Sequence, residues 1–177
     1  MIKSAFDQSA FIPFANLVVD TNGLYRMIND LATVQRSLFK NKEGTISEKS
    51  KDFLVSDLAL VFAEVEKNGL EPPGDAKQQE FVRDLITFLR DLPVVKLTIA
   101  FGPTTTFLSR VNQQISTVIG RKAVLDVVVN EYIMGGVIFE YNGRVRQDTL
   151  DEKLNKTVAD LVARQKSGKG EEVVNSK

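Results

Sequence analysis

The hydrophobic residues of this chain change their spacing at Pro93. Before this proline, apolar side chains recur every three or four residues, which is the period of a helix that buries one face. After it, apolar and more polar residues alternate from Val95 to Phe101, which is the period of a half-buried strand. We therefore expect an α+β protein, with a helical bundle over residues 1–92, a small mixed α/β domain over 93–166, and a polar, disordered tail over 167–177.

Two amphipathic helices are expected first in the bundle. One covers residues 24–40 and ends in the sequence Asn41-Lys-Glu-Gly44, where glycine is a common helix terminator. The next follows Thr45-Ile-Ser-Glu48, because a hydroxyl residue and a glutamate three residues later form a capping box. This second helix would carry the apolar residues from Phe53 to Val65 and end at Asn68-Gly69.

A third helix is expected between a proline-rich connector and Pro93. Asp75 and Gln78 repeat the capping arrangement at its start, and the residue before a proline disfavours helical geometry at its end. Each of the three helices has one apolar stripe, so the three can share one core. We expect that core to contain Phe53, Phe62, Phe81 and Phe88.

A short apolar segment over residues 11–19 precedes these helices. Pro13 lies near its start, and Asn22-Gly23 is expected to separate it from the first long helix. The segment could be one or two helical turns or an extended hook. We interpret it as a docking element.

After Pro93 the pattern predicts a crossover unit. The strand over 95–101 is followed by a helix that Thr104 caps and Gly120 ends. A nearly continuous apolar strand follows at about residues 123–129. Two strands joined through a helix lie side by side or one apart, with a right-handed connection.

A hairpin and a last helix complete the expected order β-α-β-β-hairpin-α. The pair Gly135-Gly136 leads into the hairpin, one glycine allowing an unusual backbone angle and the other close packing. Asn142-Gly143 predicts a type I′ turn, which needs positive φ at both central residues. Asp148 is expected to be the N-cap of a helix over about 149–164.

Composition excludes several classes of function. The chain has no histidine and no cysteine, so the commonest general base, the commonest metal ligand and the thiolate nucleophile are all missing. Its 23 basic and 23 acidic residues balance, which does not suit a nucleic-acid-binding protein. No apolar run is long enough to span a bilayer, and Asp7 and Pro13 interrupt any signal peptide.

Two weak motifs suggest chemistry, and both have simpler explanations. Gly102-Pro103 lies between a strand and a helix, where backbone N–H groups can bind phosphate, but the lysine of a phosphate-binding loop is absent. Asp148, Asp151 and Glu152 could form a metal site, although acidic residues at a helix N-terminus also complement its dipole. We expect a turn and a capped helix, with no catalytic residue, no cofactor and no metal.

The order of motifs after Pro93 resembles the C-terminal part of the F-type ATP synthase delta subunit, the oligomycin-sensitivity-conferring protein of mitochondria. The resemblance lies in four stretches that follow one another with the family's spacing, and it covers roughly the last two-fifths of the chain. The length and the helical first half also agree with this family. The stretches are Val95-Lys-Leu-Thr-Ile-Ala100, Gly120-Arg-Lys-Ala-Val-Leu125, Asn130-Glu-Tyr-Ile-Met-Gly-Gly136 and Asp148-Thr-Leu-Asp-Glu-Lys-Leu154.

The resemblance implies a structural subunit of a rotary enzyme, without catalytic activity of its own. In the family, this subunit binds the α subunits, next to the β subunits, of the catalytic head (the F1 sector), and also the b subunits of the peripheral stalk. It holds the head still so that proton transport and rotation are coupled to ATP synthesis. The protein would then be peripheral to the cytoplasmic face of the cell membrane and held there only through the complex.

On this interpretation the apolar helix faces supply the contacts. Leu24, Ile28 and Leu31 would contact the head, and Leu150, Leu154 and Val158 would contact the stalk, each in addition to a role in the core. Two alternatives remain open. One is an unrelated interaction or regulatory module, and the other is a small enzyme that uses the carboxylates of Asp148 and Glu152.

Overall fold

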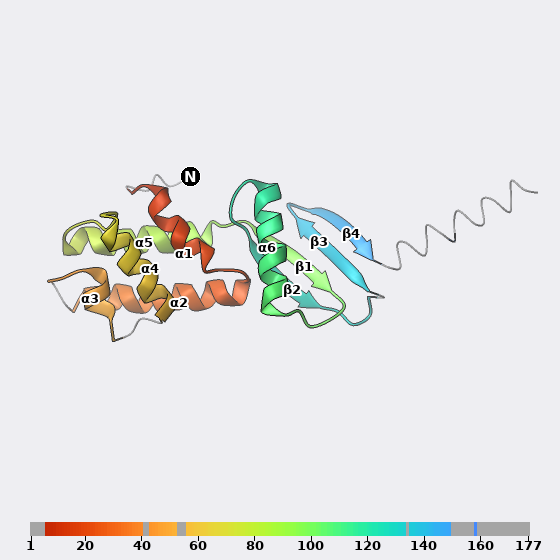
Figure 1. The fold of residues 1–177 in the computed structure, drawn as a ribbon, viewed down its shortest axis with the longest axis horizontal. Coiled ribbons are helices and arrows are strands. Elements are labelled where there is room, and N and C mark those ends of the chain that lie inside the picture. The colour runs from red at the N-terminus through yellow and green to blue at the C-terminus, as the bar shows by residue number, and fades with distance from the viewer. Residues whose placement is uncertain (1–5, 41–42, 53–55, 134, 150–157, 159–177) are drawn as a thin grey trace, which may run out of the picture. The chain divides into compact units, whose positions relative to one another are not determined.

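The computed structural model describes residues 6–40, 43–52, 56–133, 135–149 and 158 of the chain (Figure 1). These residues form helices and one four-stranded sheet, so the protein is of mixed α+β composition, as the sequence predicts. Contacts divide the chain into two units. The first contains Met1–Val95 and Pro103–Asp126, and the second contains Lys96–Gly102 and Val127–Lys177.

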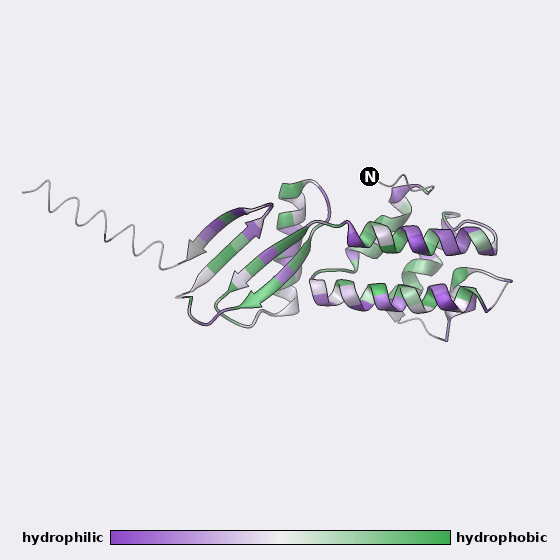
Figure 2. Cartoon of the chain, turned by 180° about the vertical axis from the view of Figure 1, so that it is seen from behind, coloured by the Kyte–Doolittle hydropathy of each residue, from purple (hydrophilic) through white to green (hydrophobic). Residues whose placement is uncertain are grey.

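All the helices whose first and last residues are described belong to the first unit. Two of them, α2 and α5, are long and pack against each other, and in Figure 2 both carry hydrophobic and hydrophilic residues in alternating bands. In chain order the helices are η1 (Gln8–Phe11), α1 (Ile12–Asn16), α2 (Thr21–Leu38), α3 (Ile46–Ser50), α4 (Ser56–Lys67), α5 (Asp75–Arg90) and α6 (Thr105–Ile119).

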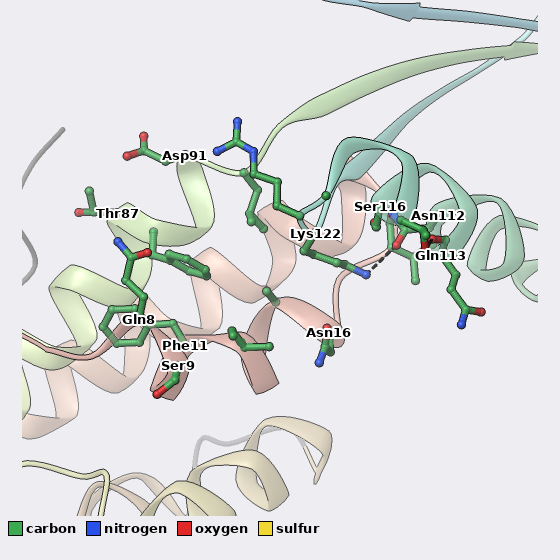
Figure 3. Close-up of a pocket in the computed structure, with 18 of the residues that line it drawn as sticks. Gln8, Ser9, Phe11, Asn16, Thr87, Asp91, Asn112, Gln113, Ser116 and Lys122 are labelled. Atoms are coloured by element: carbon green, nitrogen blue, oxygen red, sulfur yellow. Dashed lines mark hydrogen bonds between the residues drawn. The ribbon is translucent and has the colours of Figure 1, made fainter.

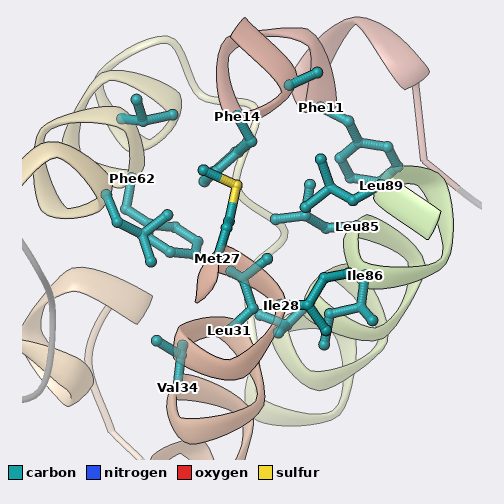
Figure 4. Packing of buried hydrophobic residues seen from close by; sticks show 14 of the residues in the cluster. Phe11, Phe14, Met27, Ile28, Leu31, Val34, Phe62, Leu85, Ile86 and Leu89 are labelled. Atoms are coloured by element: carbon teal, nitrogen blue, oxygen red, sulfur yellow. The ribbon is translucent and has the colours of Figure 1, made fainter. Parts of the chain in front are cut away.

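Aromatic and branched side chains from η1, α1, α2, α4 and α5 meet in the core of this unit (Figure 4). Phe11 packs edge-on against Phe81 with ring centroids 5.2 Å apart, and Phe14 packs in the same way against Phe62 at 4.9 Å. All four rings are at most 1% exposed. The segment 11–19 is therefore helical as far as Asn16 and packed into the core, rather than an extended hook, and full burial of each ring contributes about 2–3 kcal/mol.

Three of the predicted core phenylalanines are described. Phe62 and Phe81 are buried, and Phe88 is partly buried against the same cluster. Phe53 lies outside the described residues.

The first long helix begins earlier than the sequence suggested, and Asn22-Gly23 is not a break. The Asp20 carboxylate accepts a hydrogen bond from the Gly23 N–H at 2.7 Å, so α2 starts at Thr21. This cap satisfies a donor that the first helical turn would otherwise leave unpaired. An Asn-Gly pair is tolerated there because the cap and the buried residues further along α2 fix the helix.

The expected second helix is two helices. The capping box at Thr45 and Glu48 is present, but it starts α3, which ends at Ser50, and α4 begins separately at Ser56. Lys49 explains the orientation of α3, because its ammonium donates to Asp75 at 2.9 Å and to Gln78 at 2.7 Å. These contacts hold α3 at the start of α5, and α3 is also bonded to α4, because the Glu66 carboxylate accepts from the Ser47 N–H.

The capping role expected of Asp75 and Gln78 is wrong. The N-cap of α5 is Gly74, which makes no side-chain cap. Asp75 instead pairs with Lys49, and Gln78 donates to the Glu71 carboxylate at 2.7 Å and to the Gly44 carbonyl at 3.2 Å. A buried lysine needs oxygen partners, and Asp75 and Gln78 supply them to Lys49 in place of capping α5.

The sheet has the strand order β2-β1-β3-β4. Strand β1 pairs antiparallel with β3, Leu97 lying opposite Phe139, and β3 pairs antiparallel with β4. The crossover helix α6 has the predicted ends, because Thr104 accepts from the Phe107 N–H at 3.2 Å and Gly120 has φ of 78°. The strands are β1 (Val94–Ile99), β2 (Val124–Val129), β3 (Gly136–Tyr141) and β4 (Arg144–Thr149).

The hairpin turn is confirmed, and the position of Asp148 is a correction. Asn142 and Gly143 have φ of 50° and 71°, as a type I′ turn requires. Asp148 lies inside β4, opposite Val137, and is not the N-cap of a helix. The ladder of β3 and β4 continues to the pair of Gly136 with Thr149, so strand pairing outweighs the local capping preference of aspartate.

Candidate functional site

A cavity of about 1240 Å³ opens between η1, α1, α5 and α6, all within the first unit (Figure 3). Its floor is apolar and includes Phe11, Ile12, Phe88 and Leu92. Phe11 and Phe88 lie with ring centroids 5.5 Å apart, which fixes both rings. Ile12 is 51% exposed, so part of this floor faces solvent.

The rim of the cavity is polar. The helices contribute amide and hydroxyl side chains, among them Gln8, Asn16, Thr87, Gln113 and Thr117. Such groups can hydrogen-bond a ligand and fix its orientation. An apolar floor inside a polar rim suits a partner with one apolar face.

A buried amide lies at one end of the cavity. Asn112 of α6 is 2% exposed, and its Nδ2 donates to the Val19 carbonyl at 3.0 Å and to the Ala123 carbonyl at 2.7 Å. Its Oδ1 accepts a hydrogen bond from Lys122 Nζ at 2.6 Å, drawn as a dashed line in Figure 3. One amide group thus joins the connector before α2, the helix α6 and the start of β2.

Backbone hydrogen bonds strengthen the same junction. The Leu125 N–H donates to the Val19 carbonyl at 3.0 Å, and the Val124 N–H donates to the Pro93 carbonyl at 2.8 Å. Asp20 and Leu125 form a parallel bridge. The wall of the cavity that contains Asn112 is therefore fixed by several independent contacts.

The cavity carries charges of both signs. Arg121 and Lys122 follow the end of α6, whereas Asp84 lies on α5 and Asp91 is its C-cap. Lys122 is half-buried, and this burial lowers the pKa of its ammonium below the ordinary value. Lys122 stays close to Asn112, whereas Arg121 is exposed.

A second polar cluster lies where α3 meets the connector before α5. The Glu71 carboxylate accepts from the Ile46 N–H at 2.8 Å, and the Glu66 carboxylate accepts from the Ser47 N–H at 2.8 Å. Burial, with the nearby negative charge of Glu66 as a further cause, raises the pKa of Glu71 to about 7. The cluster holds the first turn of α3, and its groups already bond one another.

The structure does not bring the sequence-predicted contact residues into the cavity. Leu24, Ile28 and Leu31 are 6%, 9% and 0% exposed and belong to the core of the first unit, which accounts for their apolar character. Val158 is helical and 55% exposed, whereas Leu150 and Leu154 lie outside the described residues.

The predicted glycine positions have the backbone angles that only glycine adopts readily. Gly135 and Gly136 have φ of 70° and 99°, so both members of the pair, and not one, need positive φ. They turn the chain from the loop after β2 into β3. Their role in the described structure is to set the path of the hairpin.

Sequence reasoning missed Asn112 and Lys122. A signal was present, because Asn112 lies four residues after the buried Leu108 and so shares its face of α6. An amide on a buried helix face must find hydrogen-bond partners. The partners themselves come from residues 93 positions and 11 positions away along the chain, which no local pattern indicates.

No protein-family model matches this chain, and no curated protein matches it significantly. Among the described residues, no cluster of three or more acidic, histidine or cysteine side chains could hold a metal ion. In the described part of the chain, no helix is both long enough and apolar enough to cross a bilayer.

Proposed function

We propose that this protein is a non-catalytic stator subunit of an F-type ATP synthase. It would link the α and β subunits of the catalytic head to the b subunits of the peripheral stalk. Its N-terminal helical bundle would bind the head, and its C-terminal α/β domain would bind the stalk. The protein would lie at the cytoplasmic face of the membrane, held there through the complex.

The order of elements from β1 to β4 carries this proposal. Strand β1 is followed by α6, then β2, then a glycine pair at positive φ, then a hairpin with an Asn-Gly turn. This is the order and spacing in which the sequence resembles the delta-subunit family. Strand β4, where the resemblance suggests a helix start at Asp148, departs from that expectation.

The cavity supports a role in binding another protein. Its volume of about 1240 Å³ is above the usual range for small-molecule sites, which is about 300–1,000 Å³. An apolar floor with a polar rim is the kind of groove that receives the apolar face of an amphipathic helix. The same groove would serve the second candidate, an interaction module unrelated to ATP synthase, so the partner must be identified directly.

The test is affinity purification of the tagged full-length chain from membranes of the organism that makes it, with mass spectrometry of the proteins recovered. Recovery of α, β and b subunits together supports the stator proposal. Recovery of a different, reproducible set of proteins would favour the unrelated module. An untagged strain provides the control for proteins that bind the resin.

A further inference from the structure

Lys122 has an unusual environment for a lysine near the surface. It is half-buried in the lining of the cavity, and burial lowers the pKa of its ammonium. Among the residues that the structure describes, its one hydrogen-bond acceptor is Asn112 Oδ1, at 2.6 Å. Asn112 cannot reorient to offer Lys122 a second acceptor, because its Nδ2 is held by the Val19 and Ala123 carbonyls.

Within the described part of the chain, no carboxylate forms an ion pair with this ammonium. The ion pairs among the described residues involve Lys49, Arg83 and Lys96, and neither Lys122 nor Arg121 takes part in one. The acidic residues that line the same cavity, Asp84 and Asp91, belong to the α5 side. Two cations that are neighbours in the sequence thus line the cavity outside every ion pair of the described residues.

A partly desolvated ammonium is stabilised most by an ionised oxygen. Two of the three Lys122 N–H donors remain for such a group once Asn112 is bound. Arg121 lines the same cavity, and its planar guanidinium suits carboxylate and phosphate oxygens. Water could also hydrate the ammonium, but it would not supply a negative charge.

We propose that the part of this cavity that Lys122 and Arg121 line is a binding site for an oxyanion, a phosphate or a carboxylate group, held by these two side chains. Free phosphate is one source of this chemistry, and an acidic side chain of a segment lying on the apolar floor is another. The proposal rests on the cavity and its two cations, and it holds whether or not the chain belongs to an ATP synthase.

The experiment is a titration of the ¹⁵N-labelled full-length chain with sodium phosphate, with sodium acetate, and with sodium chloride at matched ionic strength. We expect saturable shifts of the Lys122 and Ala123 backbone amides and of the Asn112 side-chain amide. Saturation with phosphate alone identifies a phosphate site, and saturation with acetate identifies a carboxylate site. Both results support an oxyanion site.

The variant Lys122→Gln keeps a donor for Asn112 but removes the charge. It should bind the same anion at least about tenfold more weakly, because a hydrogen bond to a charged group contributes about 1.5–3 kcal/mol. The matched control is Lys96→Gln, which removes an exposed lysine on β1 and should leave the affinity unchanged.

Three results would overturn the proposal: shifts no larger than those with chloride, shifts centred on other residues, or equal affinity in Lys122→Gln. The map of shifted amides in the unaltered protein decides the question even if that variant does not fold. The exposed Arg121→Gln then serves as the second variant.

Discussion

Asn112 joins three segments of the chain through a single amide group. Both of its amide hydrogens and its oxygen are used, and all three partners come from outside its own helical turn. Leucine has nearly the same size but cannot form any of these bonds. The Ala123 carbonyl and the Lys122 ammonium would then lose this partner in a place that water reaches poorly, whereas the Val19 carbonyl keeps the Leu125 N–H.

We predict that Asn112→Leu lowers the free energy of unfolding by about 2 kcal/mol, since the Ala123 carbonyl loses its Asn112 donor and a buried group left without a partner costs about 1–3 kcal/mol. Urea unfolding measures this change. Gln113→Leu, at the next and exposed position of α6, is the control and should change stability by no more than about 0.5 kcal/mol. Equal losses in the two variants would mean that the amide does not hold the junction.

Glu71 links stability to pH. Its pKa is raised from 4.5 to about 7 in the folded protein, chiefly by burial and also by the charge of Glu66. The folded state therefore keeps a proton that the unfolded state loses. The resulting stability is fully present below about pH 4.5 and is lost as the pH rises through about 7.

We predict that the protein loses stability between about pH 5 and pH 8, and that Glu71→Gln removes this loss. The introduced glutamine side chain keeps an oxygen for the Ile46 N–H but carries no charge at any pH. The gain at pH 8 should be about 1 kcal/mol, since the group is partly exposed and solvent screens it. Thermal unfolding across the pH series measures it, with the exposed Glu80→Gln as control.

At the scale of elements, the hydrophobic period predicts most helices and strands but not their partners. The helix α6 has the expected ends because Thr104 and Gly120 act within their own turns. The helix start expected at Asp148 is wrong, because an aspartate near a strand end and an aspartate at a helix start have the same local sequence signals. The pairing of β3 with β4 decides that Asp148 belongs to a strand and not to a helix start. This pairing is set by the Asn142-Gly143 turn.

The second expected helix is divided into α3 and α4 by contacts that are distant in the sequence. The residues of α3 and α4 have compatible helical spacing, so a single helix was the simplest prediction. Lys49 of α3 is buried and bonds to partners on α5 that lie 26 and 29 positions later in the chain. These long-range contacts explain why α3 is a helix separate from α4. The same limit applies to the candidate site, whose walls come from four elements that meet only in the folded chain.

The turn between β3 and β4 gives a test at this scale. Gly143 has φ of 71°, and a side chain added there would meet no atom within 4 Å, so only backbone strain opposes alanine. Gly143→Ala should therefore lower stability by about 1 kcal/mol, measured by thermal unfolding. Gly102→Ala has equal space without positive φ and should be neutral or slightly stabilising. Similar effects in both variants would contradict a strained turn.

For the whole molecule, the two units do not follow the order of the chain. Helix α6 and the start of β2 belong with the N-terminal helices, and the chain passes between the units after Val95, after Gly102 and after Asp126. A subunit that transmits force between two partners benefits from several covalent connections between its parts. Under the stator proposal, head and stalk contacts should then be separable by mutation while each unit stays folded.

We predict that Ile12→Lys, on the exposed part of the cavity floor, reduces recovery of α and β subunits at least about tenfold but retains b. Val158→Asp, at an exposed helical position in the other unit, should have the opposite effect. A charge on an apolar contact surface must be desolvated on binding, which opposes assembly. Affinity purification with quantitative mass spectrometry measures both losses.

Leu60→Lys is the matched control for both variants. Leu60 is 70% exposed on α4 and does not line the cavity, so the charge should leave recovery of every subunit unchanged. If Leu60→Lys reduces recovery as much as Ile12→Lys does, the cavity is not the surface that binds the head. If Ile12→Lys and Val158→Asp each lose all partners together while both variants remain folded, assembly depends on one continuous interface, and the two-ended arrangement is wrong.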